Sequence, residues 1–251
     1  IGGGNLIAGN FIGTDPTGVT EIGNGGGIII GTTTGGFSSN NVIGGTTPEL
    51  RNVVAGNIGI FSDPRAADLN HSRGNTILGN YVGVAADGIT VLASVSSQGP
   101  AFVKKGGGIT IDTGDHGGTG LAGNTIGGIE PGAGNIIAFN DDGGVHVLSG
   151  YGNSIRGNSI YAAAPPATEF VNTFRSLGIS LGNADKVANL ATNDAGDADT
   201  GDRLIRSSLS DSLVIPGGNR GQNFPVLSSA IVANGAITIQ GRLDSARKTI
   251  Y

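Results

Sequence analysis

One short pattern decides the fold of this chain: NLIAGN at 5–10, repeated as NVVAGN at 52–57, NTILGN at 75–80 and NSIRGN at 153–158. Each copy begins with Asn and carries an aliphatic residue two positions later. Related forms of the same pattern are NVIGG at 41–45, NTIGG at 124–128 and NIIAFN at 135–140. A motif that recurs along a chain is typical of repeat architectures, in which each unit is stabilised by stacking on its neighbours.

A second motif, Gly followed by alternating apolar residues, alternates with the first. It occurs as GIII at 27–30, GIF at 59–61, GITI at 108–111, GVHV at 144–147 and GISL at 178–181. The order is constant, because each Gly-Ile strand is followed by two Asn strands. Three short strands per cycle predict a right-handed, three-faced parallel β-helix of about five coils, interrupted by an insertion at about 84–106.

The side chains inside the Asn motifs agree with this arrangement. Successive residues of a strand face opposite sides, and stacked strands lie ~4.8 Å apart. We therefore expect Asn side chains to form hydrogen-bonded ladders between coils and Gly to occupy corners that need positive φ. The inward column of the first Asn strand is aliphatic throughout, with Ile7, Ile43, Ile77, Ile126 and Ile155.

Composition excludes several classes of protein. Glycine supplies 48 of 251 residues, and aromatic residues only 5%, so the core must be aliphatic and built from thin layers. A net charge of −5 with only 14 Lys and Arg argues against a nucleic-acid partner. No apolar run approaches the ~18 residues of a membrane helix, and the absence of Cys removes disulfides and thiolate sites. The chain begins within a motif, so we expect it to be a piece of something longer.

The repeat also carries a family resemblance. NLIAGNFIGTDPTG, NVIGG and NVVAGN resemble the right-handed parallel β-helix repeats of large bacterial exported and surface proteins, over about residues 1–182. GDADTG at 196–201 and QNFPVLSSA at 222–230 resemble the segment that closes such helices, although RLIRSSLSDSLVIPGGNR separates them here. The resemblance implies an extracellular or cell-surface location in a bacterium. Pectate-lyase-like polysaccharide enzymes share the architecture, but a fold alone does not imply a function.

The sequence divides into three parts. Residues 1–182 form the predicted β-helix, and 183–225 form an irregular acidic or polar linker or cap. Residues 226–251 form an antiparallel hairpin, because Asn234-Gly235 separates two alternating apolar runs. This hairpin either caps the solenoid or begins a following β-sandwich, and we favour the sandwich.

Candidate catalytic residues lie on the outer face of the Gly-Ile strands. We expect Ile29, Phe61, Thr110, His146 and Ser180 to form its outward column. Acids there could serve a glycosidase, which needs two carboxylates on either side of the scissile bond, and a base with a cation could serve a lyase. The candidates for these roles are Asp112, Asp141, Asp142, His146 and Arg156.

Two further features could bind a ligand. The acidic loop at 193–202 offers oxygen ligands of the kind that calcium prefers, from Asp194, Asp197, Asp199 and Asp202. The second Asn strand has an apolar outward column that could stack sugar rings, or be covered by the tail, the insertion or a neighbouring molecule. Its members are Phe11, Val53, Tyr81 and Ile136.

Two functions follow. The first is a non-catalytic extracellular module, structural or adhesive, whose partners are polysaccharide or other copies of itself, including a filament. The second is a polysaccharide lyase or glycoside hydrolase that uses the face around Asp112 and His146. Neither function involves nucleic acid or membrane insertion, and calcium is the one cofactor that the sequence suggests.

Overall fold

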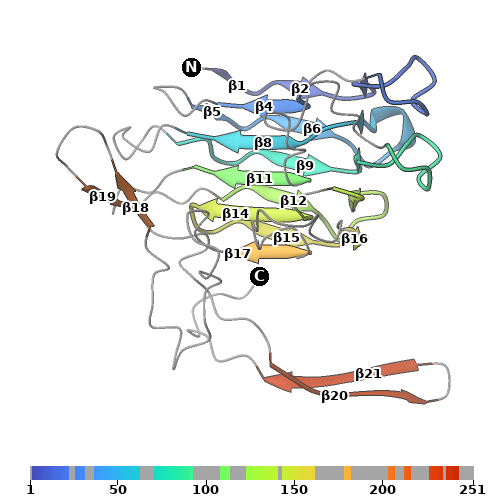
Figure 1. The fold of residues 1–251 in the computed structure, drawn as a ribbon, viewed down its shortest axis with the longest axis vertical. Coiled ribbons are helices and arrows are strands. Elements are labelled where there is room, and N and C mark those ends of the chain that lie inside the picture. Colours follow the sequence, from blue (N-terminus) through green and yellow to red (C-terminus); the bar gives the residue numbers. More distant parts are fainter. Residues whose placement is uncertain are drawn as a thin grey trace, which may run out of the picture.

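The computed structural model describes most of the repeat region and parts of the tail. The described residues are 2–22, 26–31, 37–62, 71–92, 108–113, 123–140, 143–161, 178–181, 203–206, 212–215, 226–233 and 236–242. Its strands stack in parallel along one axis, as Figure 1 shows. The chain is therefore the predicted three-faced parallel β-helix, in which each coil contributes one strand to each of three sheets.

Each sheet contains five parallel strands in coil order. The first Asn sheet comprises β2 (Leu6–Ile7), β6 (Val42–Gly44), β9 (Thr76–Leu78), β12 (Thr125–Gly127) and β15 (Ser154–Arg156). The second Asn sheet comprises β3 (Phe11–Ile12), β7 (Val53–Val54), β10 (Tyr81–Val82), β13 (Ile136–Ala138) and β16 (Ser159–Tyr161). The Gly-Ile sheet comprises β4 (Ile28–Ile30), β8 (Ile58–Phe61), β11 (Ile109–Asp112), β14 (Val145–Ser149) and β17 (Ile179–Leu181).

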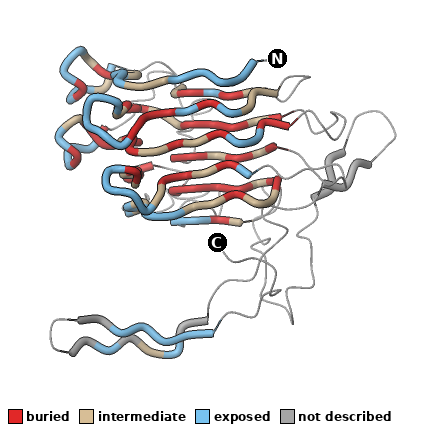
Figure 2. Tube along the Cα trace, turned by 180° about the vertical axis from the view of Figure 1, so that it is seen from behind, coloured by how far each residue is buried: buried red, intermediate tan, exposed pale blue. Residues whose placement is uncertain are grey.

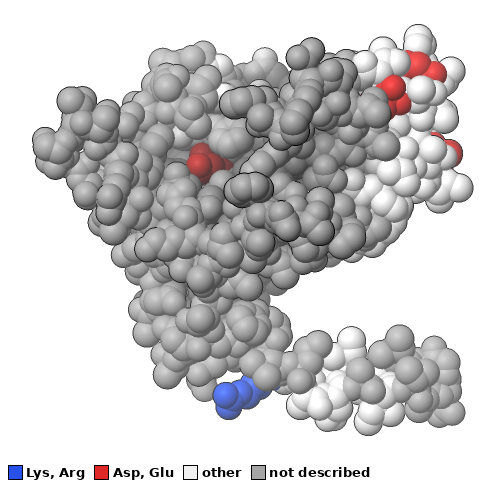
Figure 3. All heavy atoms as spheres, in the orientation of Figure 1, with Lys and Arg blue, Asp and Glu red and all other residues white. Residues whose placement is uncertain are grey.

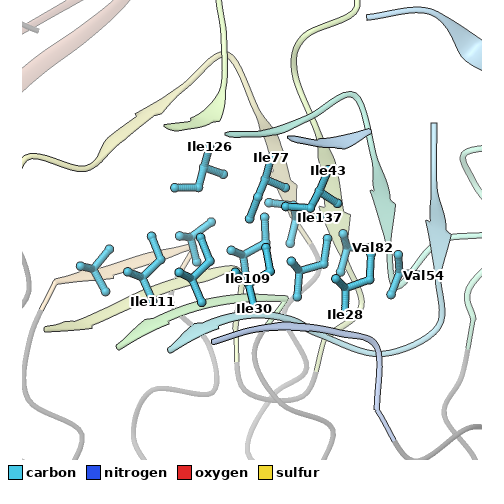
Figure 4. Close-up of a cluster of buried hydrophobic side chains, with 14 residues drawn as sticks. Ile28, Ile30, Ile43, Val54, Ile77, Val82, Ile109, Ile111, Ile126 and Ile137 are labelled. Atoms are coloured by element: carbon cyan, nitrogen blue, oxygen red, sulfur yellow. The ribbon is translucent and has the colours of Figure 1, made fainter. Parts of the chain in front are cut away.

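The core is a set of aliphatic columns that run through the coils. Ile43 pairs with Ile77, and Ile126 with Ile155, so each side chain rests on the same residue type one coil away. Ile43, Ile77 and Ile126 are fully buried, whereas Ile7 and Ile155 at the two ends are only partly buried. Figure 4 shows the columns from the three sheets meeting in one cluster. In this column an isoleucine is thus fully buried only where its coil has neighbours on both sides.

Two ladders of asparagines, buried in the interior coils, join the coils at the strand starts. The Asn80 side chain accepts hydrogen bonds from the amide and Nδ2 of Asn52, and its own Nδ2 donates to Asn135 Oδ1 at 3.1 Å. A second Nδ2 hydrogen goes to a backbone carbonyl, that of Ile43 at 2.9 Å. The ladders consist of Asn5, Asn41, Asn75, Asn124 and Asn153, and of Asn10, Asn52, Asn80, Asn135 and Asn158.

The corner between the two Asn strands has two lengths that alternate along the solenoid. In coils 1, 3 and 5 the second Asn follows the first by five residues, from Asn5 to Asn10, Asn75 to Asn80 and Asn153 to Asn158. In coils 2 and 4 the spacing is eleven residues, from Asn41 to Asn52 and Asn124 to Asn135. Coils are numbered from the N-terminus, and we call those with the five-residue spacing odd coils and those with the eleven-residue spacing even coils. The period of the structure is therefore two coils.

The short corners depend on glycine. Gly79 has a φ of +69°, and a Cβ atom there would overlap the carbonyl oxygen of Gly45 in the long corner beside it. Gly157 has a φ of +68° and meets the carbonyl of Gly128 in the same way. Long and short corners thus interlock, with the long corner of coil 2 carrying the one-turn helix η1 (Pro48–Leu50).

Odd coils 1 and 3 also carry a hairpin after the second Asn strand. Thr14 bridges Glu21 in the first, and Val84 bridges Val91 in the second, in antiparallel geometry. The two hairpins stack, because the Ala86 amide donates to the Gly18 carbonyl at 2.9 Å across coil 2. Residues 84–92 of the predicted insertion are this second hairpin, while the rest of the insertion lies outside the described residues. Figure 2 shows how exposed these hairpins are, compared with the buried strands.

The described residues of the tail form two antiparallel pairs. β20 (Val226–Ala233) pairs with β21 (Ala236–Arg242), and Ala233 faces Ala236, as the Asn-Gly pattern predicts. We expected 183–225 to be irregular, but β18 (Arg203–Arg206) pairs with β19 (Ser212–Ile215) within it. The sequences RLIR at 203–206 and SLVI at 212–215 are too short to show the alternation of apolar and polar residues that predicts a strand. The two segments nevertheless pair with each other through their backbones. β1 (Gly2–Gly3) pairs with β5 (Ser38–Ser39) at the solenoid's other end.

The ladder predicts a position-dependent cost of removing asparagine. Asn80→Ala removes the acceptor of the buried Asn52 amide and Nδ2, and it removes the Nδ2 donor to Ile43 and Asn135, so we expect a loss of about 3 kcal/mol in unfolding free energy. Asn10→Ala, at the exposed end of the same ladder, should cost about 1 kcal/mol or less. Urea denaturation of both variants measures the difference. Equal losses would contradict the dependence of the cost on position in the ladder.

Candidate functional site

The outer face of the Gly-Ile sheet holds the candidate catalytic residues. Its outward column is Ile29, Gly59, Thr110, His146 and Ser180, as the strand register shows. Our placement of Phe61 in this column is wrong, because Phe61 pairs with Asp112. The strand begins at Ile58, one residue before Gly59, so that Ile58 and Ile60 both face the core and are fully buried.

Asp112 lies at the end of β11, beside a bulge in β14. The register shifts between Ile111 and Asp112, so Asp112 pairs with Ser149. The Ser149 hydroxyl donates to Asp112 Oδ1 at 2.6 Å. Ser149 is completely buried and Asp112 is partly buried. The carboxylate is therefore held in one orientation by a buried hydroxyl group, and only part of it faces solvent.

His146 lies on β14 and pairs with Thr110, which is two residues before Asp112 on β11. It faces Thr110 on one neighbouring strand and Ser180 on the other. Its side chain is only 5% exposed. The structure therefore brings Asp112 and His146 onto adjacent strands of one sheet, as we expected, but it buries the histidine. A base that is to abstract a proton from a polymeric sugar must lie within hydrogen-bond reach of it, and this burial opposes such contact.

The other catalytic candidates do not join this pair in the described structure. Arg156 is exposed at the end of β15, which belongs to the first Asn sheet and not to the Gly-Ile sheet. Asp141 and Asp142 lie outside the described residues. The second carboxylate of a glycosidase pair therefore has no described counterpart near Asp112, and the cation of a lyase pair lies on another face.

The four aspartates of the predicted calcium site lie outside the described residues. Asp194, Asp197, Asp199 and Asp202 all belong to the stretch 182–202, which the structure does not describe. Within the described ranges, no three His, Asp or Glu side chains gather in a way that could hold a metal ion.

The apolar outward column of the second Asn sheet is partly covered. Phe11 is 48% exposed, Tyr81 and Ile136 are intermediate, and Val53 is 2% exposed. Val53 belongs to a small cluster with Ala55, Ala85 and Leu92, the last two from the hairpin of coil 3. The hairpin therefore covers Val53 and removes it from any surface that could stack a sugar ring.

Tyr81 is held between a cation and its own hairpin. The guanidinium group of Arg51 lies 4.1 Å from the centre of the Tyr81 ring, and Arg51 Nε donates to the Gly79 carbonyl at 3.1 Å. On the hairpin side, a Cβ atom at Gly88 would lie 3.2 Å from the Tyr81 hydroxyl. Gly18 stands in the same relation to the Phe11 ring in coil 1. These aromatic rings thus anchor hairpins to the solenoid.

Aspartates in the hairpin turns have lowered pKa values. The Thr20 amide and the Thr17 hydroxyl, with smaller effects from other amides, hold the pKa of Asp15 below its usual range. The hydroxyl and amide of Thr90, and then the Ile89 amide, lower the pKa of Asp87. DPTG and DG are strong turn patterns, but a turn pattern alone does not indicate a lowered pKa, so the sequence did not identify these two residues. Figure 3 shows acidic side chains at its upper right, where the hairpins project in Figure 1.

A buried polar corner after the Gly-Ile strands was also missed. His71 is 2% exposed, and its Nδ1 lies 2.9 Å from the Thr113 carbonyl oxygen. Neither His71 Nε2 nor Thr113 Oγ1 has a hydrogen-bond partner, although both are buried. Ser62 and Ser72 complete the corner, where Ser62 Oγ accepts from the Ser72 amide at 2.7 Å. An isolated His in a turn carries no sequence pattern that would have identified it.

The class of this protein is assigned from its fold, because comparison with known proteins found no match. No family model, no curated protein and no solved structure matches this chain. None of the described residues forms a helix that is long and apolar enough to cross a membrane. The stacked coils, the two asparagine ladders and the continuous aliphatic core define the chain as a parallel β-solenoid repeat protein.

The turn aspartates predict a local pH effect. A carboxyl group whose pKa is lowered on folding stabilises the fold above its unfolded pKa of ~3.9, and this contribution disappears as the pH falls through the folded value. Below about pH 4 we therefore expect the Ile89 and Thr90 amides to lose protection in hydrogen exchange, after correction for intrinsic rates. Asp87→Asn should remove most of this pH dependence. Unchanged protection of both amides at low pH would contradict the assignment.

Proposed function

We propose that this chain is a non-catalytic, extracellular β-solenoid module, structural or adhesive, within a larger bacterial surface or secreted protein. The observation that supports the proposal best is the regularity of the solenoid. Both ladders continue through all five coils, and the sheet that carries Asp112 and His146 stays paired on either side of β11 and β14, with one register shift beside Asp112. Within the described coils, the hairpins, the helix η1 and the bulge beside Asp112 depart from the repeat, but they do not bring the candidate catalytic residues to one exposed position.

The state of the candidate catalytic residues supports the same proposal. The carboxylate of Asp112 is bound by Ser149, His146 is buried, and Arg156 is exposed on a different sheet. An enzyme that cleaves a polysaccharide needs its acid, base and charge-stabilising groups around one exposed position. A structural module needs only a continuous core and a surface to present.

The acidic composition and the absence of cysteine agree with an exported protein. A net charge of −5 favours solubility and opposes binding to polyanions. The partners that we propose are polysaccharide, or other copies of the chain in a filament. The enzymatic alternative is a pectate-lyase-like lyase or a glycoside hydrolase acting at Asp112 and His146.

Incubation with a panel of acidic and neutral polysaccharides tests the proposal. We expect no new unsaturated ends by ultraviolet absorbance and no new reducing ends, because His146, the other candidate that the structure describes beside Asp112, is buried. Asp112→Asn is the matched control, since it keeps the shape of the side chain. Turnover by the original chain that disappears in Asp112→Asn would overturn the structural role in favour of an enzyme.

A further inference from the structure

A glycine on the outer face of the Gly-Ile sheet lies beneath an aromatic ring. Gly59 belongs to the outward column of this sheet, and a Cβ atom there would lie 2.2 Å from Phe61 Cε2 and 3.0 Å from Ile29 Cδ1. The Phe61 ring is therefore folded back along β8 over the residue that has no side chain. Although the backbone of Phe61 pairs with Asp112, its ring fills the gap in the outward column between Ile29 and Thr110.

The ring and its apolar neighbour are accessible to solvent. Ile29 is 55% exposed and Phe61 is partly exposed, whereas Ile58 and Ile60 on either side of Gly59 are fully buried. Glycine at position 59 thus allows an aromatic ring to lie on an accessible face of the sheet. Aromatic side chains with a few fixed polar groups beside them are typical of surfaces that bind small ligands.

Two polar side chains border the ring on the next coil. Thr110 pairs with Gly59, and Asp112 pairs with Phe61, so both lie on β11, ~4.8 Å from the strand that carries the ring. Both are partly exposed. The Ser149 hydroxyl is completely buried and donates to Asp112 Oδ1 at 2.6 Å. The carboxylate is therefore oriented before any ligand binds, which reduces the entropy lost on binding.

The charge on this face determines which ligands fit it. In the described strands of the Gly-Ile sheet, Asp112 is the only acidic residue, and no Lys or Arg occurs. A uronate would meet this carboxylate without a cation to offset the repulsion. A ligand with an ammonium group would instead place positive charge beside Asp112 and near the electron-rich face of the Phe61 ring.

The arrangement of these groups favours a sugar over a flexible amine. One face of a pyranose ring is made of C–H groups, so it can lie flat on the Phe61 ring while polar groups at its edge reach Thr110 and Asp112. A lysine side chain has an ammonium group but no such plane. The surface therefore matches a ring that is apolar on its face and polar at its edge.

We propose that Phe61, Thr110 and Asp112 form a binding subsite for an amino sugar of a polysaccharide, a pyranose that carries an ammonium group. The sugar ring stacks on Phe61, and the ammonium group pairs with Asp112. This inference rests on the proposed function, because it names the kind of polysaccharide that the non-catalytic module binds. It also accounts for Gly59, the one residue of the outward column that has no side chain.

Calorimetric titration with a chitosan oligosaccharide, with its amines protonated and at low salt, tests the subsite. A chitin oligosaccharide of the same length should bind about tenfold more weakly, because its nitrogens are acetylated and uncharged. An oligogalacturonate should not bind, and added salt should weaken the binding of chitosan. Equal affinities for chitosan and chitin would overturn the recognition of an ammonium group.

Three variants test the residues of the subsite. Asp112→Asn should weaken chitosan binding about tenfold, and Phe61→Leu about fivefold. Gly59→Ala should weaken it about as much as Phe61→Leu, because the new Cβ atom displaces the Phe61 ring while Phe61 itself remains. The nearest atoms to that Cβ belong to side chains, so the urea midpoint of Gly59→Ala should stay close to the original. Unchanged affinity in folded Gly59→Ala and Phe61→Leu would overturn the proposal.

Two matched controls separate the subsite from general attraction between an acidic protein and a polycation. Phe11→Leu removes an exposed ring from the second Asn sheet, and Glu130→Gln removes an exposed carboxylate from the long corner of coil 4. Both variants should bind chitosan as the original chain does. If Glu130→Gln weakens binding as much as Asp112→Asn does, the attraction is non-specific and the subsite is wrong.

The same titrations distinguish the failure of the subsite from the failure of the proposed function. If the chain binds none of the three oligosaccharides, the subsite is wrong, whereas the structural role of the module is unaffected. If chitosan binds through Phe61 and is also cleaved, the subsite is correct and the non-catalytic function is wrong. New reducing ends in the titrated sample measure such cleavage.

Discussion

The buried asparagine ladder is the interaction on which the rest of this structure depends. Each interior Asn side chain accepts from the coil before it and donates to the coil after it, so it connects three coils while it satisfies backbone groups at a corner. Unpaired polar groups at these buried positions would be costly. The ladder therefore aligns the coils, and this alignment places every aliphatic column in register. The ladder and the backbone pairing of the three sheets together hold the strands above one another, and this alignment brings the isoleucines of the thin core into contact.

The hydrogen bonds of the asparagine ladders also give the solenoid a direction along its axis. The donors of each ladder point toward the C-terminal end of the solenoid, and the acceptors point toward its N-terminal end. The two ends are thus chemically different, although the sheets look alike from either side. The alternation of long and short corners adds a second distinction, because odd and even coils interlock through corners and hairpins.

This regularity also bears on function. The residues that the repeat uses most, asparagine, glycine and isoleucine, are occupied in ladders, corners and core, and they leave few groups for chemistry. The residues outside the repeat that could act chemically are separated by the architecture, since Asp112 and Arg156 belong to different sheets. Burial of His146 and the hydrogen bond from Ser149 to Asp112 further restrict that face. A solenoid of this kind presents surface more readily than it assembles an active site.

The sequence by itself determined the class of fold, the inward columns and the asparagine ladders, because each depends on a local period that neighbouring residues reveal. It also predicted the β20–β21 hairpin from Asn234-Gly235. Only the tertiary structure decided the register of β8, the burial of Val53 and the exposure of Ile22. Each of these depends on contacts between coils that are far apart in sequence. Ile22 and Leu92 occupy equivalent positions in their hairpins, and the coil beside each one decides which of them is buried.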